Sequence, residues 1–400
     1  MNTQSMPTCI TEYTGDLSGK KVIVRAELNA PIADGMVDDD FRIKRFLPTL
    51  SYLEEKGAII IVLAHMGRSL DDTLEPVAEY LADHVHNMMF YKDFFHSYGT
   101  DEFNKNADTL QGDLTHAKPG DVFLLDNIRQ TKEEKANNEN LAKTIADLGD
   151  LYVHEAFPAA HRKHCSTYGV PSLFTGENKF SGVTFHMEHT MLASAMKPAS
   201  PSVFVLGGAK FDTKLPLIES FLPLYDKVMV GGALANNLIQ LAGYEVGVSL
   251  VEELTVKQEE SLKKVLQSDK FLLPSYVTCE TKDGEKVTKM LSEITSTDNI
   301  LDVSPEALNK NSSLFTDAKT FLWNGPLGYY EGGYTAGSQK LAKLVAKSDS
   351  KSIAGGGDTI AAIYSIDQQD NFTFLSSAGG AMITYLAEGS LPGIEILVTD

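Results

Sequence analysis

Side chains that bind anions are divided unequally along this 400-residue chain. All ten histidines lie before residue 190. The six arginines lie before residue 163, namely Arg25, Arg42, Arg45, Arg68, Arg129 and Arg162. A guanidinium group is a planar fork suited to carboxylate or phosphate, whereas the lysine ammonium is a mobile point charge. We therefore expect the first half of the chain to hold a small anion, although drift in composition would also separate the two residue types.

The candidate anion ligands of the first half stand in short polar motifs. VRAELNAP places Glu27 and Asn29 at alternate positions after an apolar run, and AHMGR places His65 and Arg68 after another. The remaining candidates, from FRIKR, LLDNIR and AAHRKHC, are Arg42, Arg129 and Arg162. Taken singly, each is more often a surface ion pair or a satisfied histidine than a ligand. Their repeated position at strand ends and helix starts favours binding.

Glycine-rich turns mark the second half. They are GGAK at Gly207–Lys210, GGGDT at Gly355–Thr359 and SSAGGAM at Ser376–Met382. Glycine lets the backbone approach phosphate oxygens, and a helix N-terminus presents free N–H groups to them. Asp358 could hold a magnesium ion there, although a simple N-cap is the favoured alternative for this turn alone. Three such turns together favour a nucleotide.

Lys210 and Lys214 would share one face of a helix that opens at the first turn. There they could meet a triphosphate or remain solvated. Neither GxxxxGK(S/T) nor GxGxxG occurs in the sequence, which weakens the case for the two usual nucleotide-binding classes. The missing GxGxxG also disfavours an NAD-dependent oxidoreductase. A cluster of His154, His161 and His164 with Cys165 lacks a second ligand pair at zinc spacing, so we expect no metal there.

The elements that must position these residues are short apolar runs separated by helix-like segments. Examples of the runs are Lys21–Ala26, Ala58–Ala64, Asp121–Asp126, Ser202–Gly208, Lys227–Gly232, Thr320–Gly325 and Lys351–Gly357. Continuous apolar runs are typical of strands buried on both faces of a parallel sheet. Their alternation with helices predicts α/β layers, and the length predicts two domains. A helix is expected within Gly182–Pro201, either as a hinge between the domains or as a plain surface helix.

Composition restricts the partners. The net charge of −19 argues against nucleic acid and anionic membranes. Three cysteines without metal spacing indicate free thiols in a reducing compartment. The first residues lack a leader pattern, and no apolar run reaches membrane-spanning length. We therefore expect a cytoplasmic protein.

The motifs resemble those of the phosphoglycerate kinase family. In the first half these are VRAELNAP, FRIKRFLPTL, AHMGR, LLDNIR and EAFPAAHRKHCS. In the second half they are GGAKFDTK, VGGALAN, LWNGPLGYYE, IAGGGDT and SSAGGA, in the family's order. The resemblance runs from about Lys20 to Gly393. Several motifs in order over nearly the whole chain are highly specific.

The resemblance implies two Rossmann-like three-layer (αβα) domains with mostly parallel sheets, joined by a hinge helix. It implies a phosphoglycerate-binding domain at residues 1–181, a hinge at 182–198 and a nucleotide-binding domain at 199–385. Residues 386–400 would pack back on the first domain. The implied enzyme is a monomeric, hinge-bending kinase that transfers phosphoryl between ATP, with Mg2+, and the carboxylate of 3-phosphoglycerate.

The resemblance also implies site residues. Those for phosphoglycerate are Glu27, Asn29, Arg42, His65, Arg68, Arg129 and Arg162. Those for the nucleotide are Gly208, Lys210, Lys214, Asn324, Pro326, Glu331, Gly356, Gly357, Asp358 and Thr359, with Asp358 also on the metal. The expected catalytic groups are Arg42, Lys214 and the backbone of Gly379 and Gly380.

The sequence also departs from the family's pattern. Glu27 stands for an aspartate, Pro158 for a glycine and Ala378 for the first glycine of a glycine run. Proline fixes φ near −65°, so the loop at Pro158 cannot copy a glycine with positive φ. These departures keep an alternative open, a divergent nucleotide-binding protein of the same fold with weak or lost kinase activity. Retention of Arg42, Lys210, Lys214 and Asp358 argues against such loss.

Overall fold

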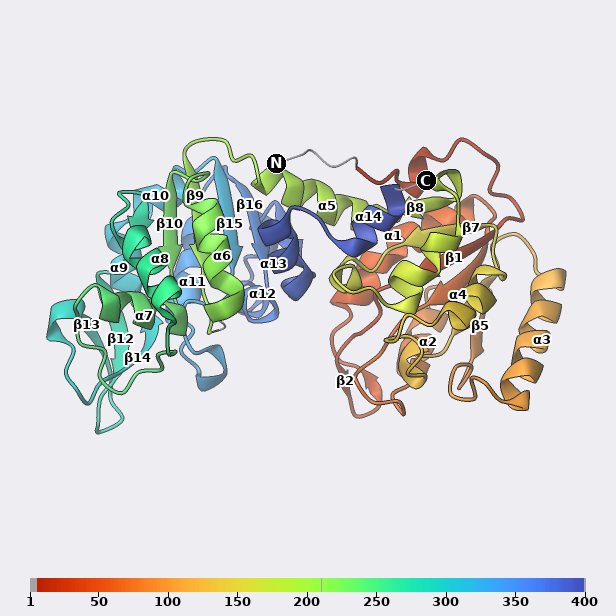
Figure 1. Cartoon of the computed structure of the whole chain (residues 1–400), viewed down its shortest axis with the longest axis horizontal. Coiled ribbons are helices and arrows are strands. Elements are labelled where there is room, and N and C mark those ends of the chain that lie inside the picture. The colour runs from red at the N-terminus through yellow and green to blue at the C-terminus, as the bar shows by residue number, and fades with distance from the viewer. Residues whose placement is uncertain (1–5, 210, 399–400) are drawn as a thin grey trace. The chain divides into compact units, whose positions relative to one another are not determined.

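The chain forms two compact units in the computed structural model, which describes residues 6–209 and 211–398 (Figure 1). Unit 1 comprises Met1–Thr190 together with Gly389–Asp400, and unit 2 comprises Met191–Glu388. The first boundary therefore lies inside helix α5 (Val183–Ala195), in the segment where a helix was predicted. Unit 2 is a single continuous stretch of chain, whereas unit 1 is made from two stretches.

Unit 1 is built on a six-stranded parallel sheet with the strand order β5-β6-β4-β1-β7-β8. These strands are β1 (Lys21–Arg25), β4 (Ile59–Leu63), β5 (Met88–Tyr91), β6 (Val122–Leu125), β7 (Leu151–His154) and β8 (Lys179–Ser181). A short hairpin pairs β2 (Ile32–Ala33) with β3 (Met36–Val37). The helices are α1 (Phe41–Glu55), α2 (Glu75–Ala82), α3 (Asp101–His116), α4 (Glu139–Ala146), the first part of α5, and α14 (Pro392–Val398).

The core of unit 1 follows from the alternation of side chains along buried strands. Val22 and Val24 of β1 pack in one cluster with Phe46 of α1 and Val77 of α2. The intervening Ile23 is equally buried, so both faces of the strand are covered. Helix α14 completes the unit, and its Gly393 N–H donates to the Ala160 carbonyl at 2.8 Å.

Unit 2 has a second six-stranded parallel sheet, with the order β11-β10-β9-β15-β16-β17. These strands are β9 (Ser202–Leu206), β10 (Lys227–Val230), β11 (Phe271–Leu272), β15 (Thr320–Asn324), β16 (Lys351–Gly355) and β17 (Phe374–Ser376). A separate antiparallel sheet, which the sequence did not predict, contains β12 (Tyr276–Glu280), β13 (Lys286–Met290) and β14 (Asn299–Val303). The helices are α6 (Phe211–Phe221), α7 (Ala233–Leu241), α8 (Val256–Leu266), α9 (Pro305–Lys310), α10 (Ser312–Thr316), α11 (Ala336–Val345), α12 (Gly357–Tyr364) and α13 (Gly379–Glu388).

Helices cover both faces of the unit 2 sheet. Val205 of β9 and Trp323 of β15 pack against a cluster from α9, α10, α11 and α12. Phe204 points to the opposite face, where its ring centroid lies 4.9 Å from that of Phe221 in α6. The prediction of three-layer α/β domains with mostly parallel sheets is confirmed.

Within the described residues no single helix is long and apolar enough to cross a membrane. Helices α13 and α14, taken together as a bent pair, meet the criteria of length and composition alone.

Phe321→Ala should lower the free energy of unfolding of unit 2 by about 3–5 kcal/mol, because a fully buried aromatic ring leaves a cavity when it is removed. The chain has one tryptophan, Trp323, which is buried on the same strand, so its fluorescence in urea follows the unfolding of this unit. The exposed Lys319→Ala is the control, with an expected change within about 0.5 kcal/mol. Equal midpoints for the two variants would contradict the prediction.

Candidate functional site

Four glycine turns gather at the carboxyl ends of neighbouring strands in unit 2. They follow β9, β10, β15 and β16 at Gly207–Gly208, Gly231–Gly232, Gly325 and Gly355–Gly356. The turns are tied together, since Gly208 N–H donates to the Pro326 carbonyl at 2.9 Å. At Gly207 a Cβ atom would lie 2.1 Å from the Pro326 carbonyl oxygen, so no other residue fits. At Gly356 φ is +101°, a conformation that favours glycine.

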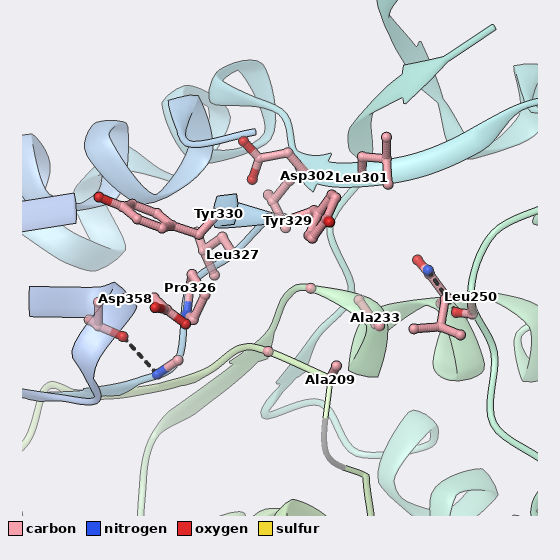
Figure 2. Close-up of a pocket in the computed structure, with 18 of the residues that line it drawn as sticks. Ala209, Ala233, Leu250, Leu301, Asp302, Pro326, Leu327, Tyr329, Tyr330 and Asp358 are labelled. Carbon is pink, nitrogen blue, oxygen red and sulfur yellow. Dashed lines mark hydrogen bonds between the residues drawn. The ribbon is translucent and has the colours of Figure 1, made fainter. Parts of the chain in front are cut away.

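These turns border a cavity of about 740 Å3. Figure 2 shows Asp358 and Pro326 on one side of it and Leu250 and Leu301 on the other, with Ala233 between them. One end of the cavity is therefore formed by bare backbone and a carboxylate, and the other by apolar side chains. A cavity of this size with one polar and one apolar end suits a small organic anion.

The structure brings the candidate nucleotide ligands of the described chain to this cavity. Its lining includes Gly208, Lys214, Asn324, Pro326, Glu331, Gly356, Gly357, Asp358, Thr359 and Gly379. Gly380 follows in the first turn of α13, and Lys210 lies outside the described residues.

The side chains of this set differ in exposure and in their contacts. Lys214 is buried, and its Nζ donates to the Gly207 carbonyl. Thr359 Oγ1 accepts from Gly325 N–H at 2.9 Å, so it fixes the turn. The alternative role of Asp358 as an N-cap is wrong, because Gly356 occupies the N-cap position and Asp358 lies exposed within the first turn of α12.

In unit 1, arginines contact the residues that follow β1 and β4. Arg42 Nη1 donates to Glu27 Oε1 at 3.2 Å and to the Asn29 carbonyl at 2.8 Å. Arg129 Nη1 donates to the Gly67 carbonyl at 2.8 Å. Two buried atoms, Glu27 Oε2 and Arg129 Nε, have no hydrogen-bond partner among the described residues. A buried polar atom left unpaired costs free energy, so these two atoms are suited to a ligand.

The other candidates of unit 1 differ in exposure. Arg68 and Arg162 are exposed, and the Arg162 Nε lies 3.0 Å from His161 Nε2. The Asn29 side chain accepts from Gly67 N–H at 2.9 Å, so it shapes the loop that carries Arg68. Of the seven candidates, Glu27, His65 and Arg129 are thus buried, Asn29 and Arg42 are half-buried, and the two remaining arginines are free to reach solvent.

Arginines act together on the groups around His65 and Arg129 in unit 1. Burial, reinforced by nearby arginines, lowers the pKa of His65 well below its ordinary value. Burial, with repulsion from Arg25 and Arg162, lowers the pKa of Arg129 to about 10. Cations that destabilise one another in this way are stabilised by an anion placed between them. The arrangement therefore favours binding of a small anionic compound.

Two groups of residues near these sites were missed at the sequence level. Arg25 is almost fully buried and contacts His65, yet an arginine at the end of an apolar run gave no sign of its burial. The apolar end of the cavity, with Leu250, Leu301 and Tyr329, comes from a loop and from the antiparallel sheet that was not predicted. Exposed apolar residues in a loop are common, so these residues could not be recognised from their type and position alone.

Metal-ligand clusters are absent from the part of the chain that the structure describes, since no three His, Cys, Asp or Glu side chains converge there. Pro158 lies in a short 3-10 helix (Phe157–Ala159), a conformation that its fixed φ allows.

A two-domain phosphotransferase requires one binding site for a small anion and another for a phosphate chain. Here each of these candidate sites is built on its own parallel α/β unit. Comparison with known proteins identifies the same class. The profile of the phosphoglycerate kinase family matches residues 11–389. The chain belongs to this family, whose members are glycolytic kinases.

Named relatives support the assignment over the whole length. The phosphoglycerate kinase of Clostridium beijerinckii is 36% identical, over 96% of this chain and 97% of that protein. That of Francisella philomiragia is 34% identical, over 96% of each. Among solved structures, phosphoglycerate kinase from Coxiella burnetii has a TM-score of 0.82 at 32% identity and covers 98% of both chains. That from Pyrococcus horikoshii has a TM-score of 0.80 at 26% identity, with the same coverage.

Glu155→Gln should remove part of the pH dependence of stability. Burial raises the pKa of Glu155 from 4.5 to about 7, although Phe185 N–H, the Thr49 hydroxyl and Thr184 N–H all donate to it. The native state therefore keeps this proton at pH values where the unfolded chain has lost it, and the free energy of unfolding falls as pH rises between those two values. The contribution is on the order of 3 kcal/mol.

Urea unfolding of both proteins at about pH 5 and about pH 8, followed by circular dichroism, measures this difference. The exposed Glu177→Gln is the matched control and should keep the wild-type pH dependence. The same loss of stability in the wild type and in the Glu155 variant would contradict the assignment.

Proposed function

We propose that this chain catalyses reversible phosphoryl transfer between ATP and the carboxylate of 3-phosphoglycerate, giving ADP and 1,3-bisphosphoglycerate. Membership of the phosphoglycerate kinase family supports this reaction over the alternative of a nucleotide-binding protein that has lost activity. The observation that carries the proposal is the cavity of unit 2, where Lys214 and four bare glycine turns meet. A lost function would leave no reason for a buried lysine at that position.

The acceptor is assigned to unit 1. Arg68 and Arg162, being exposed, are suited to the phosphate group of 3-phosphoglycerate, with Arg129 and His65 behind them. Glu27 Oε2, buried without a described partner, is suited to accept from the substrate hydroxyl. Its extra methylene relative to aspartate is accommodated, because its other oxygen reaches Arg42. Asn29 then holds both the Arg68 loop and Arg42.

The nucleotide is assigned to the cavity of unit 2. The glycine turns and Lys214, with Lys210 as an expected ligand, would face the phosphates. Asn324, Pro326 and Thr359 border the same end, and Thr359 keeps the Gly325 turn in place. The nucleobase would lie at the apolar end beside Leu250, Leu301 and Tyr329, and the exposed Glu331 would accept from the ribose hydroxyls.

Magnesium fits the residues present. Asp358 is an exposed carboxylate beside the phosphate end of the cavity, and Mg2+ typically uses one or two carboxylates together with phosphate oxygens and water. A site with a single protein carboxylate therefore agrees with the absence of a larger ligand cluster in the described chain. When bound, the ion would neutralise charge on the phosphates.

The chemistry needs positioning more than proton transfer. The acceptor carboxylate is ionised at neutral pH, so no general base is required. Arg42 would hold this carboxylate, Lys214 would follow the transferring phosphoryl group, and backbone N–H groups of Gly379 and Gly380 at the start of α13 would bind its oxygens. Ala378, which precedes them, leaves those amides in place.

Bringing both substrates together requires hinge closure, which would also exclude water. A cytoplasmic monomer with domains divided at residues 181, 198 and 385 belongs to the same proposal.

A coupled assay tests the proposed reaction. ATP and 3-phosphoglycerate are supplied, and the 1,3-bisphosphoglycerate formed is reduced with oxidation of NADH. Turnover by the purified protein is the expected result. Tight ATP binding without turnover would favour the inactive alternative instead.

Lys214→Ala should reduce kcat at least about a hundredfold, the scale of losing one transition-state donor. ATP binding, measured by calorimetry, should change much less. Lys343→Ala on α11 removes an exposed lysine outside the cavity and serves as the control with wild-type kcat. Near-normal turnover of the Lys214 variant would remove this residue from the chemistry.

Arg68→Ala and Arg162→Ala should each raise KM for 3-phosphoglycerate, with little change in KM for ATP. The expected increase is roughly tenfold or more, since each removes a charge-assisted hydrogen bond. Steady-state kinetics with each substrate varied in turn measures both constants. A rise in KM for ATP alone would mean that the two substrates are assigned to the wrong units.

A further inference from the structure

The contact between Arg25 and His65 fixes where the imidazole proton lies. Arg25 Nη2 is 3.0 Å from His65 Nδ1, and both side chains are buried. A guanidinium group has five N–H donors and no acceptor, so it can only donate in this contact. Nδ1 must therefore offer a lone pair, and the proton of the neutral ring must be on Nε2.

We infer that Arg25 is a positioning residue that locks His65 in the neutral tautomer with hydrogen on Nε2, so that His65 serves the anionic substrate as a fixed N–H donor and not as a titrating cation. The role in substrate binding rests on the proposed function, whereas the tautomer rests on geometry alone. A fixed neutral donor gives the site one hydrogen bond of constant direction. Its strength then does not vary with pH near neutrality.

Arg25 is itself held by a buried network that leaves it no freedom to turn. Its Nε donates to Ser166 Oγ at 2.7 Å, and its Nη1 donates to the Ala26 carbonyl. Ser166 Oγ in turn donates to Glu134 Oε1 at 2.6 Å, while its backbone N–H donates to Oε2 of the same carboxylate at 2.8 Å. The three donors of Arg25 and the backbone N–H of Ser166 each have a single assignment, because none of these groups can accept. The imidazole is thus oriented from Glu134 through Ser166 and Arg25.

The charges around the ring oppose its protonation. The cations that act on His65 are Arg25 on β1, Arg42 on α1, Arg129 after β6 and Arg162 after β7, and burial adds to their effect in lowering its pKa. The buried carboxylates of the same cluster are Glu27 and Glu134. Protonation at Nδ1 would also break the bond to Arg25. Both the surrounding charge and the hydrogen bond from Arg25 therefore disfavour an imidazolium.

Nuclear magnetic resonance of the unaltered protein tests the tautomer directly. Protein labelled with 15N-histidine is recorded in long-range 1H–15N correlation spectra from about pH 8 to about pH 6, and His65→Gln identifies the His65 signals. The expected result is an unprotonated Nδ1 and a protonated Nε2 at every pH. A hydrogen on Nδ1, in either the neutral or the charged form, would overturn the inference.

Arg25→Met tests the effect on substrate binding. The variant removes the donor to Nδ1 and the nearest cation, so the pKa of His65 should rise and the ring should begin to titrate. KM for 3-phosphoglycerate should then fall by about fivefold as the pH is lowered from about 8 to about 6, the difference between a neutral and a charge-assisted hydrogen bond. Lys44→Met, which loses an exposed cation of α1, is the control. The ratio of its KM for 3-phosphoglycerate to the KM of the wild type should be the same at both pH values.

The outcomes are distinguishable. Equal pH dependence in Arg25→Met and the wild type, with the same His65 spectrum, would overturn the positioning role. If Arg25→Met does not fold, the spectrum of the unaltered protein still decides the tautomer. If the wild type does not bind 3-phosphoglycerate at all, the proposed function fails while the tautomer assignment stands or falls by the spectrum alone.

Discussion

Parallel strand pairing is the constraint on which both sites depend, because it aligns the carboxyl ends of neighbouring strands. In unit 1, Arg25 pairs in register with Leu63 of β4 and His154 of β7. In unit 2, Asn324 pairs with Leu206 of β9 and Gly355 of β16. The residues that follow each strand are therefore delivered to one edge of the sheet. A shift of one residue in either register would exchange buried and outward-facing side chains along the strand and disperse the site.

The carboxyl-end edges of the two sheets are suited to bind anions by different means. Unit 1 uses side-chain charge, and its buried arginines are balanced by Glu27 and Glu134. Unit 2 uses backbone N–H groups freed by glycine, with Lys214 as its buried cation. Side-chain charge is strong but costs desolvation, whereas backbone dipoles carry less charge and need no counterion when the site is empty. Unit 1 accordingly has lowered pKa values at His65 and Arg129, while the glycine turns of unit 2 contribute backbone groups that do not titrate.

Much of this arrangement was predictable from sequence, and the physical reason is clear. The strand at Ile59–Leu63 is apolar on both faces, so its burial in a parallel sheet followed from composition alone. Glycine turns after such strands predicted the phosphate end of the cavity. The antiparallel sheet was not predicted, because Lys286–Met290 alternates between exposed and half-buried positions and resembles a polar loop. The buried role of Arg25 also escaped prediction, since it depends on Ser166 and Glu134, which are distant in sequence.

The chain order has a consequence for synthesis on the ribosome. Domains of most proteins fold as they emerge, the N-terminal one first. Here the N-terminal unit lacks α14 until the segment after unit 2 is made, because Gly393 packs on Ala160 and a Cβ at Gly393 would lie 2.8 Å from that side chain. The second unit, being continuous, is complete in the nascent polypeptide before the first. Completion of the first unit therefore follows synthesis of the second.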